Sequence, residues 1–357
     1  MESPIDRSRQ GQRLFRWLTP WSVVPLLAIG VLIGLAGLGR GIRGESTESP
    51  APREARTPAG APAAAGATPL ISRHAEFKPV ELNLEAGEQL DYEMRWNGLP
   101  AGRASLRVKS RNEKEDPKTW SVRLDTRSSR LVSLFYPVKD KAEAMIDQKS
   151  GCSRFFYMQK REGAYKGEER IRFDYNRTKL IAGSTLMRPD GHPSASSIPL
   201  FGKVLDPLGA LYYLRGLDLV ATRQARMQAA AERQAGACSD VEYAKRLEAL
   251  KVVLPICTDR RVWDTEIRLL TFDELKARNL KPFVKLPGLG NREPCIVVEP
   301  LCEFNGLFVR RGPLLLWIHE ATRIPVRMLV DLPIGPCEVM LVGYQHSPFN
   351  ERMTNDD

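Results

Sequence analysis

Residues 87–108 read GEQLDYEMRWNGLPAGRASLRV, and this stretch decides the fold class. Apolar residues stand at every second position from 90 to 96 and alternate with charged residues, which is the pattern of a strand with one buried face. The alternation stops at Asn97-Gly98, a pair that favours the positive backbone angles of a tight hairpin turn, and then resumes. Pro100 and Gly102 indicate a longer or bulged connection between the two strands.

The same alternation recurs along the chain, at residues 120–124, 142–146, 156–158 and 171–175 and in three segments between 313 and 344. Helical patterns are few: residues 206–217 open with Asp-Pro, residues 221–236 are rich in Ala, Gln and Arg, and Ser239-x-x-Glu242 forms a capping box. We therefore predict a mainly β fold, built as a large antiparallel curved sheet or a partly open barrel, with a helical insertion at about 221–252.

Residues 17–39 carry no charge, and their number matches a helix that crosses a bilayer. We predict one N-terminal transmembrane helix; a cleaved signal peptide is the alternative, although its apolar region would be shorter. Four arginines precede the segment and four follow it closely, so charge does not fix the orientation. The short leading tail favours a single-pass inner-membrane protein with its C-terminal part in the periplasm or an equivalent space. Gly30 and Gly34 have the spacing at which two such helices can pack as a homodimer.

The organisation that follows has five parts. A tail at 1–16 precedes the membrane helix, and residues 40–76 form a Pro-, Ala- and Gly-rich linker with too few large apolar residues to order itself. Residues 77–345 form one β-rich domain, and residues 346–357 form a C-terminal tail. The linker would let the domain stand away from its anchor.

Charge and cysteines exclude some classes of protein. The net charge is +10, but Lys and Arg are mixed with Asp and Glu, whereas a nucleic-acid binder concentrates its positive charge on one stripe. We expect no nucleic-acid partner. The six cysteines contain no CxxC pair, so the usual zinc and redox spacings are missing, and they fit either disulfides or buried thiols.

The sequence shows little catalytic chemistry. His319-Glu320 begins the zinc motif H-E-x-x-H, but residue 323 is Arg, so the second histidine is missing. We assign no catalytic, metal-binding or cofactor-binding residue, and no cofactor. Acidic residues are plentiful, so a pair of carboxylates that meets only in the folded chain stays open, and with it a hydrolase.

Several stretches together resemble the bacterial exported-protein family of unknown function DUF3108: FKPVELNLEAGEQLDYEMRWNGLPAG, YPVKDKAEAMID, EGAYKGEERIRFDY, DPLGALYYLR and GPLLLWIHEATRIPVRMLV. The resemblance covers roughly residues 77–345 and implies a β-rich domain in the cell envelope, with no known reaction. The segment LLLWIHEATRIPVRM is also similar to a hairpin of the periplasmic lipoprotein-carrier proteins, which fold as a curved antiparallel sheet around an apolar cavity.

Six aromatic residues lie on the inward phase of their predicted strands, and they either pack the core or line an apolar cavity. They are Tyr92, Trp96, Trp120, Phe173, Tyr175 and Trp317. Tyr212 and Tyr213 on the short helix could close one end of such a cavity. The sequence thus predicts a membrane-anchored envelope protein that binds a lipid, an acyl chain or another apolar or amphipathic ligand. The alternative is a protein-interaction module with a solid core, whose helical insertion docks a partner.

Overall fold

The computed structural model describes residues 74–82, 84–109, 119–175, 181–187, 191–258, 260–289, 291–301, 314–332 and 335–346. The predicted membrane segment 17–39, with Gly30 and Gly34, lies outside these residues, as do most of the predicted linker and Cys302. No helix within the described ranges combines the length and the apolar character that spanning a bilayer requires.

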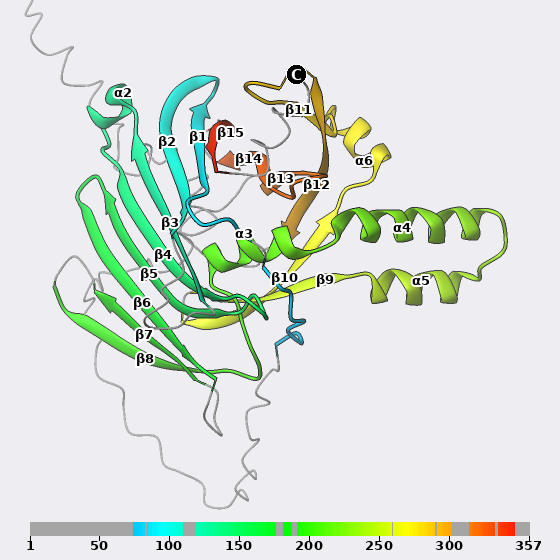
Figure 1. Ribbon diagram of the computed structural model, residues 1–357, viewed down its shortest axis with the longest axis horizontal. Coiled ribbons are helices and arrows are strands. Elements are labelled where there is room, and N and C mark those ends of the chain that lie inside the picture. Colours follow the sequence, from blue (N-terminus) through cyan, green and yellow to red (C-terminus); the bar gives the residue numbers. More distant parts are fainter. Residues whose placement is uncertain are drawn as a thin grey trace, which may run out of the picture.

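The described residues form one large, curved, antiparallel sheet that does not close into a barrel (Figure 1). The order of its strands is β8-β7-β6-β5-β4-β3-β2-β1-β15-β14-β13-β12-β10-β9, with β11 paired to β12. The prediction of a mainly β, antiparallel curved sheet is confirmed. The strands are β1 (Gln89–Trp96), β2 (Leu99–Val108), β3 (Thr119–Ser128), β4 (Lys139–Asp147), β5 (Ser153–Glu162), β6 (Tyr165–Asp174), β7 (Ile181–Met187), β8 (Pro193–Pro199), β9 (Val252–Thr258), β10 (Arg261–Leu269), β11 (Phe283–Lys285), β12 (Arg292–Leu301), β13 (Leu314–His319), β14 (Pro325–Leu332) and β15 (Gly335–Gln345).

The first hairpin of the chain, formed by β1 and β2, has a two-residue turn. Trp96 pairs with Leu99, and between them Asn97 and Gly98 have φ angles of 47° and 80°. The predicted longer connection is therefore wrong, because Asn-Gly suits a turn whose two central residues both have positive φ. The register shifts just beyond the turn, between Met94 and Arg95, so the predicted bulge is present.

Within the described residues, five helices accompany the sheet: α2 (Arg130–Ser133), α3 (Pro207–Gly216), α4 (Leu219–Gln234), α5 (Asp240–Ala249) and α6 (Phe272–Ala277). In Figure 1, α3 lies inside the curve of the sheet, whereas α4 and α5 project from it as a hairpin. α3 contacts both β4 and β9, which belong to opposite halves of the sheet. It therefore fills the space that the curved sheet surrounds.

The local sequence explains how α3 begins. Asp206 is its N-cap, and its side chain accepts hydrogen bonds from the backbone N–H groups of Leu208 and Gly209 at 2.9 and 2.8 Å. The Ser153 hydroxyl on β5 donates to the same carboxylate at 2.5 Å. Burial raises the pKa of Asp206 to about 6, although these hydrogen bonds oppose the rise. One carboxylate thus caps the helix and ties it to the sheet.

The other end of α3 is tied to the sheet by a buried ion pair. The two guanidinium nitrogens Nη1 and Nη2 of Arg215 donate to the two carboxylate oxygens of Glu88 at 2.6 and 2.7 Å. The exposed fractions of the two side chains are 7% and 1%. All residues from Pro207 to Leu214 are buried between these two fixed ends. The core therefore lies on the inner face of the sheet, around α3.

The described cysteines form no disulfide with one another. Cys152, Cys238, Cys257, Cys295 and Cys337 are all buried. The sequence left disulfides and buried thiols as alternatives, and these five residues are buried thiols.

Candidate functional site

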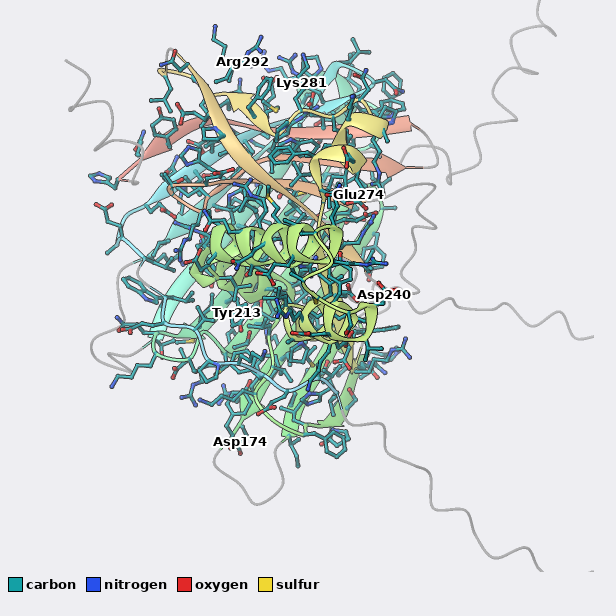
Figure 2. The ribbon with its side chains drawn as sticks, turned by 90° about the vertical axis from the view of Figure 1, so that its right-hand side faces the viewer. Asp174, Tyr213, Asp240, Glu274, Lys281 and Arg292 are labelled. Carbon is teal, nitrogen blue, oxygen red and sulfur yellow. The ribbon has the colours of Figure 1, made fainter. Side chains whose placement is uncertain are left out.

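An apolar pocket of about 530 Å³ lies between the projecting helices and strands β10 and β12 of the sheet, and we call it the hairpin pocket. Its walls come from α4, α5 and α6, and its floor comes from β10 and β12. Figure 2 shows α4 between α5, which begins at Asp240, and α6, which carries Glu274. Its volume falls within the usual range for a site that takes a small molecule.

Helical periodicity brings the wall of the hairpin pocket together. Arg223, Met227, Ala230 and Gln234 recur on one face of α4 at spacings of three and four residues, and Ala231 lies beside them. Tyr243 and Leu247, four residues apart, supply the face of α5. The floor consists of the buried residues Leu269, Cys295, Ile296 and Val297, and Leu270 and Leu275 are buried beside it.

Charged groups surround this apolar floor, and partners within the protein hold several of them. Arg223 donates to Glu320 at 2.6 Å, and Arg268 forms ion pairs with Glu274 and Glu299. Met227 and Phe272 remain about half exposed, at 53% and 54%. The pocket therefore combines an oily interior with a polar border, an arrangement that suits a ligand with one apolar part and one polar part.

The thiol of Cys295, in the floor of the pocket, has low reactivity. Burial raises the pKa of Cys295 to about 12, so the thiol keeps its proton at neutral pH. Since the thiolate is the reactive form, we assign Cys295 a role in packing.

The structure does not gather the six predicted aromatic residues in the hairpin pocket. Tyr92, Trp120, Phe173 and Trp317 are buried, and Trp96 and Tyr175 are partly buried and pack against the core. Phe173 and Tyr175 stack on each other, with ring centroids 6.4 Å apart. Their role as the lining of a ligand cavity stays a prediction.

Most of these aromatic side chains donate a hydrogen bond to a backbone carbonyl. The Tyr92 hydroxyl donates to the Pro325 carbonyl at 2.8 Å, and the indole N–H of Trp120 donates to the Leu82 carbonyl at 3.0 Å. The indole N–H of Trp317 donates to the Lys281 carbonyl at 2.8 Å. These bonds fix the rings within the core. Tyr212 and Tyr213 on α3 are buried as well.

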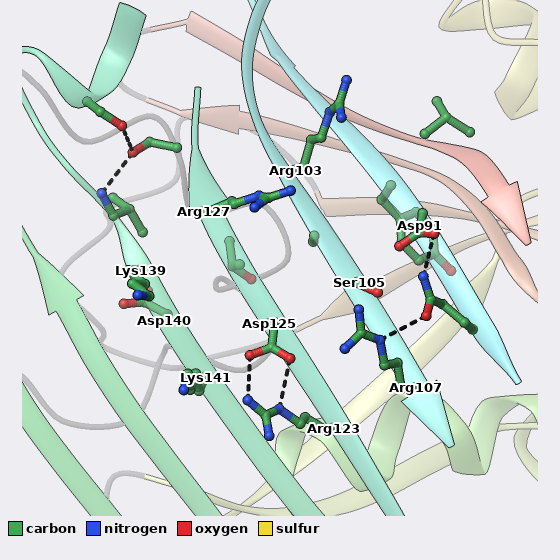
Figure 3. A pocket seen from close by; sticks show the side chains of 18 of the residues that line it. Asp91, Arg103, Ser105, Arg107, Arg123, Asp125, Arg127, Lys139, Asp140 and Lys141 are labelled. Carbon is green, nitrogen blue, oxygen red and sulfur yellow. Dashed lines mark hydrogen bonds and ion pairs between the residues drawn. The ribbon is translucent and has the colours of Figure 1, made fainter. Parts of the chain in front are cut away.

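A second hollow, of about 1030 Å³, lies on the opposite, polar face of strands β1–β4, and we call it the cationic groove (Figure 3). Six Lys and Arg residues line it against three Asp residues, namely Arg103, Arg107, Arg123, Arg127, Lys139 and Lys141 against Asp91, Asp125 and Asp140. Strand pairing places Arg103 opposite Arg127, and Arg127 opposite Lys139. The three cations thus form a row across β2, β3 and β4.

Only part of this positive charge is neutralised. Asp125 neutralises Arg123 through two hydrogen bonds, at 2.8 and 2.9 Å, whereas Gln89, which accepts from Arg107 at 2.9 Å, carries no charge. The side chains of Arg103, Arg127, Lys139 and Lys141 make no hydrogen bond or ion pair with any other described residue, and Figure 3 shows them without one. The groove therefore presents a surplus of positive charge to solvent.

Two groups of residues that could suggest hydrolysis are buried. Asp140 and Glu162 are neighbouring carboxyl groups with exposed fractions of 3% and 5%, and burial raises the pKa of both, that of Glu162 to about 7. His319 is fully buried, and its two ring nitrogens lie 2.9 Å from Thr322 Oγ1 and Glu293 Oε2. The histidine thereby links β12 to the turn between β13 and β14. Within the described residues, no group of three metal-ligating side chains is present.

Comparison with solved structures finds four chains with a distant likeness, among them the following two. A β-barrel-like protein of domain of unknown function DUF1849 from Brucella abortus is 11% identical, with 74% of this chain and 98% of that chain covered and a TM-score of 0.38. A "putative lipoprotein" from Parabacteroides distasonis is 9% identical, with 76% and 100% covered and a TM-score of 0.28. No curated protein matches the chain.

The family comparison is more specific. Residues 91–342 match the family described as "Protein of unknown function (DUF3108)". The match runs from β1 to β15 and takes in the hairpin formed by α4 and α5. This chain belongs to the DUF3108 family.

Proposed function

We propose that this protein is anchored in the membrane of the bacterial cell envelope and that its β domain binds an apolar or amphipathic ligand in the hairpin pocket. The uncharged segment 17–39 supports the anchor, and the linker at 40–76 would let the domain move around it. The observation that carries the ligand is the apolar floor of the pocket, which two projecting helices leave open at its border.

The size and chemistry of the pocket favour a lipid or an acyl chain. A volume of about 530 Å³ leaves room for a hydrocarbon chain over the apolar side chains of the floor. Each CH₂ group that moves from water into this floor contributes about 0.8 kcal/mol to binding. The arginines at the border suit a polar or negatively charged end of the same ligand.

The experiment uses the full chain in membranes together with a fatty acid that carries a photoreactive diazirine. After irradiation, peptide mapping locates the adducts, which we expect on segments 223–247 and 269–275. Ala231→Trp should block the pocket, because Ala231 is exposed and faces into it. Displacing only two CH₂ groups would cost about 1.6 kcal/mol, more than tenfold in affinity.

A matched variant controls for the added indole. Ala244 on α5 is exposed and is not part of the pocket wall, so Ala244→Trp should label like the unchanged chain. Equal labelling of Ala231→Trp and Ala244→Trp would contradict the hairpin pocket as the site. Adducts on the strands that carry Tyr92 or Trp120 would place the ligand among the predicted aromatics instead.

The hairpin also supports a second candidate function, that of a protein-interaction module. α5 has no buried residue, and Val241 on it is 80% exposed, although a helix of this length gains most of its stability from packing. An interaction module should keep its partner in the Ala231→Trp variant and lose it when residues 221–252 are removed, without any fatty-acid labelling of the pocket.

A further inference from the structure

An apolar tip projects from the sheet at the connection between β3 and β4. Leu131, Leu134 and Phe135 have exposed fractions of 62%, 75% and 77%, among the largest exposures of apolar side chains in the described chain. Leu99, 63% exposed, lies at the start of the neighbouring strand β2. Figure 1 shows α2 and the turn between β1 and β2 at the same end of the sheet.

The exposure of this tip is built into the structure. Val132 and Tyr136 pack against the core, whereas Leu131, Leu134 and Phe135 are exposed. The Ser129 side chain caps α2, and its backbone N–H donates to the Ala101 carbonyl of β2 at 2.8 Å. The connection is therefore held in place at the sheet while three large apolar side chains face solvent. Contiguous exposed apolar groups of this kind mark sites of contact with a protein or a membrane.

The cationic groove begins next to this tip. Ser133 and Pro137 of the connection line the groove together with the row Arg103, Arg127 and Lys139. Residues 126–139 contain three basic residues and no acidic residue. Like charges placed opposite each other across strands destabilise a sheet, so a row of three cations without a described partner indicates a negatively charged surface outside the chain.

We propose that the β domain docks on a bilayer of anionic lipids through the tip formed by Leu99, Leu131, Leu134 and Phe135. Apolar side chains enter the boundary between headgroups and acyl chains, and the cation row meets the lipid phosphates behind them. Arginine and lysine are suited to phosphate, arginine through its planar pair of donors. This docking does not depend on the ligand of the hairpin pocket, which lies elsewhere on the molecule.

The test uses the full chain in vesicles of phosphatidylcholine, with and without phosphatidylglycerol. A photoreactive benzoylphenylalanine replaces Phe135 in one sample and Val241 of α5 in a matched sample, because both residues are strongly exposed. Since both samples share the same anchor, only docking distinguishes them. Mass spectrometry of the intact protein measures the fraction that carries a lipid adduct. We expect more adduct at 135 than at 241, with a further rise at 135 when phosphatidylglycerol is present.

Charge variants sharpen the test. Arg127→Gln and Lys139→Gln should each lower the ratio of docked to free domain by about fivefold. Lys245→Gln on α5, an exposed lysine far from the groove in sequence, should leave the ratio unchanged. None of these residues is buried, so the fold should be retained in every variant.

Three results would overturn the proposal. The first is an equal fraction of lipid adduct at 135 and at 241. The second is a fraction of adduct at 135 that does not change when phosphatidylglycerol is added. The third is suppression of the labelling by pyrophosphate at constant ionic strength, which would assign the groove to a soluble phosphate compound. If labelling at 135 fails while the fatty acid still labels the hairpin pocket, docking is wrong and the ligand site stands.

Discussion

Two arginines on two helices make similar ion pairs in opposite surroundings. Arg215 on α3 pairs with Glu88 inside the molecule, where the side chains are 7% and 1% exposed. Arg246 on α5 pairs with Glu232 and Glu242 at the surface, where the side chains are 31–50% exposed. The first pair joins helix and sheet in the core, whereas the second joins only the two helices of the hairpin. The buried pair therefore helps to maintain the fold, whereas the surface pair helps to hold only the projecting hairpin together.

The largest effect is expected at the buried pair. Arg215→Met should lower the free energy of unfolding by about 3–5 kcal/mol, because it leaves the Glu88 carboxylate buried without a partner. Urea unfolding of the purified chain, followed by tryptophan fluorescence, measures the change. Replacing both partners, with Glu88→Leu and Arg215→Met together, should recover most of the loss, since apolar side chains tolerate burial. A loss below about 1 kcal/mol in the single variant would mean that water reaches the pair.

A second test measures whether the buried carboxyl group of Glu162 affects stability as strongly as the buried pair does. Because burial raises the pKa of Glu162 to about 7, the folded chain binds a proton more tightly than the unfolded chain does. The stabilisation from this group is fully present below about pH 4.5 and is lost as the pH rises through 7, on the order of 3 kcal/mol. Urea unfolding at a series of pH values measures the loss.

In the Glu162→Gln variant, the side chain is uncharged at every pH. The free energy of unfolding should therefore no longer change between pH 6 and 7. Below pH 6, Asp206 contributes as well, because burial raises its pKa to about 6. The part of the slope below pH 6 that comes from Asp206 should therefore remain in the Glu162→Gln variant. An unchanged slope between pH 6 and 7 would assign the pH dependence to another group.

The smallest effect is expected at the surface pair. Arg246→Met is the same substitution as Arg215→Met, but solvent already surrounds its partners, and exposed pairs contribute little to stability. The midpoint of urea unfolding should not change measurably. A clear decrease would show that the hairpin packs against the body more tightly than its exposure indicates.

Local patterns in the sequence predicted part of this fold well. The period-two alternation at 90–96 and 104–108 correctly predicted β1 and β2, and Asp206-Pro207 correctly predicted the start of α3. Such features depend on neighbours in the chain, so they can be recognised without knowledge of the fold. The capping box at Thr271 and Glu274, which starts α6, was equally recognisable and was missed.

Other elements gave weaker signals for physical reasons. β9 and β12 are buried over consecutive residues, so their sequences lack the alternation that marks a strand with one wet face. β7 and β8 are short and rich in small residues, Gly183 and four serines among them. The hairpin pocket and the cationic row could not be predicted, because both depend on which strands and helices become neighbours: Arg103, Arg127 and Lys139 form a row only in the register of β2, β3 and β4.

An open sheet has two ends, and each end strand is a template onto which another chain could add. At the β9 end, the segment before α3 covers the strand: Cys257 N–H donates to the Leu205 carbonyl at 2.7 Å, and Leu205 N–H donates to the Pro255 carbonyl at 2.9 Å. At the β8 end, Pro193 and Pro199 stand at the two termini of the strand and have no N–H to offer. These features protect the protein against edge-to-edge polymerisation, so the sheet can stay unclosed without seeding fibres.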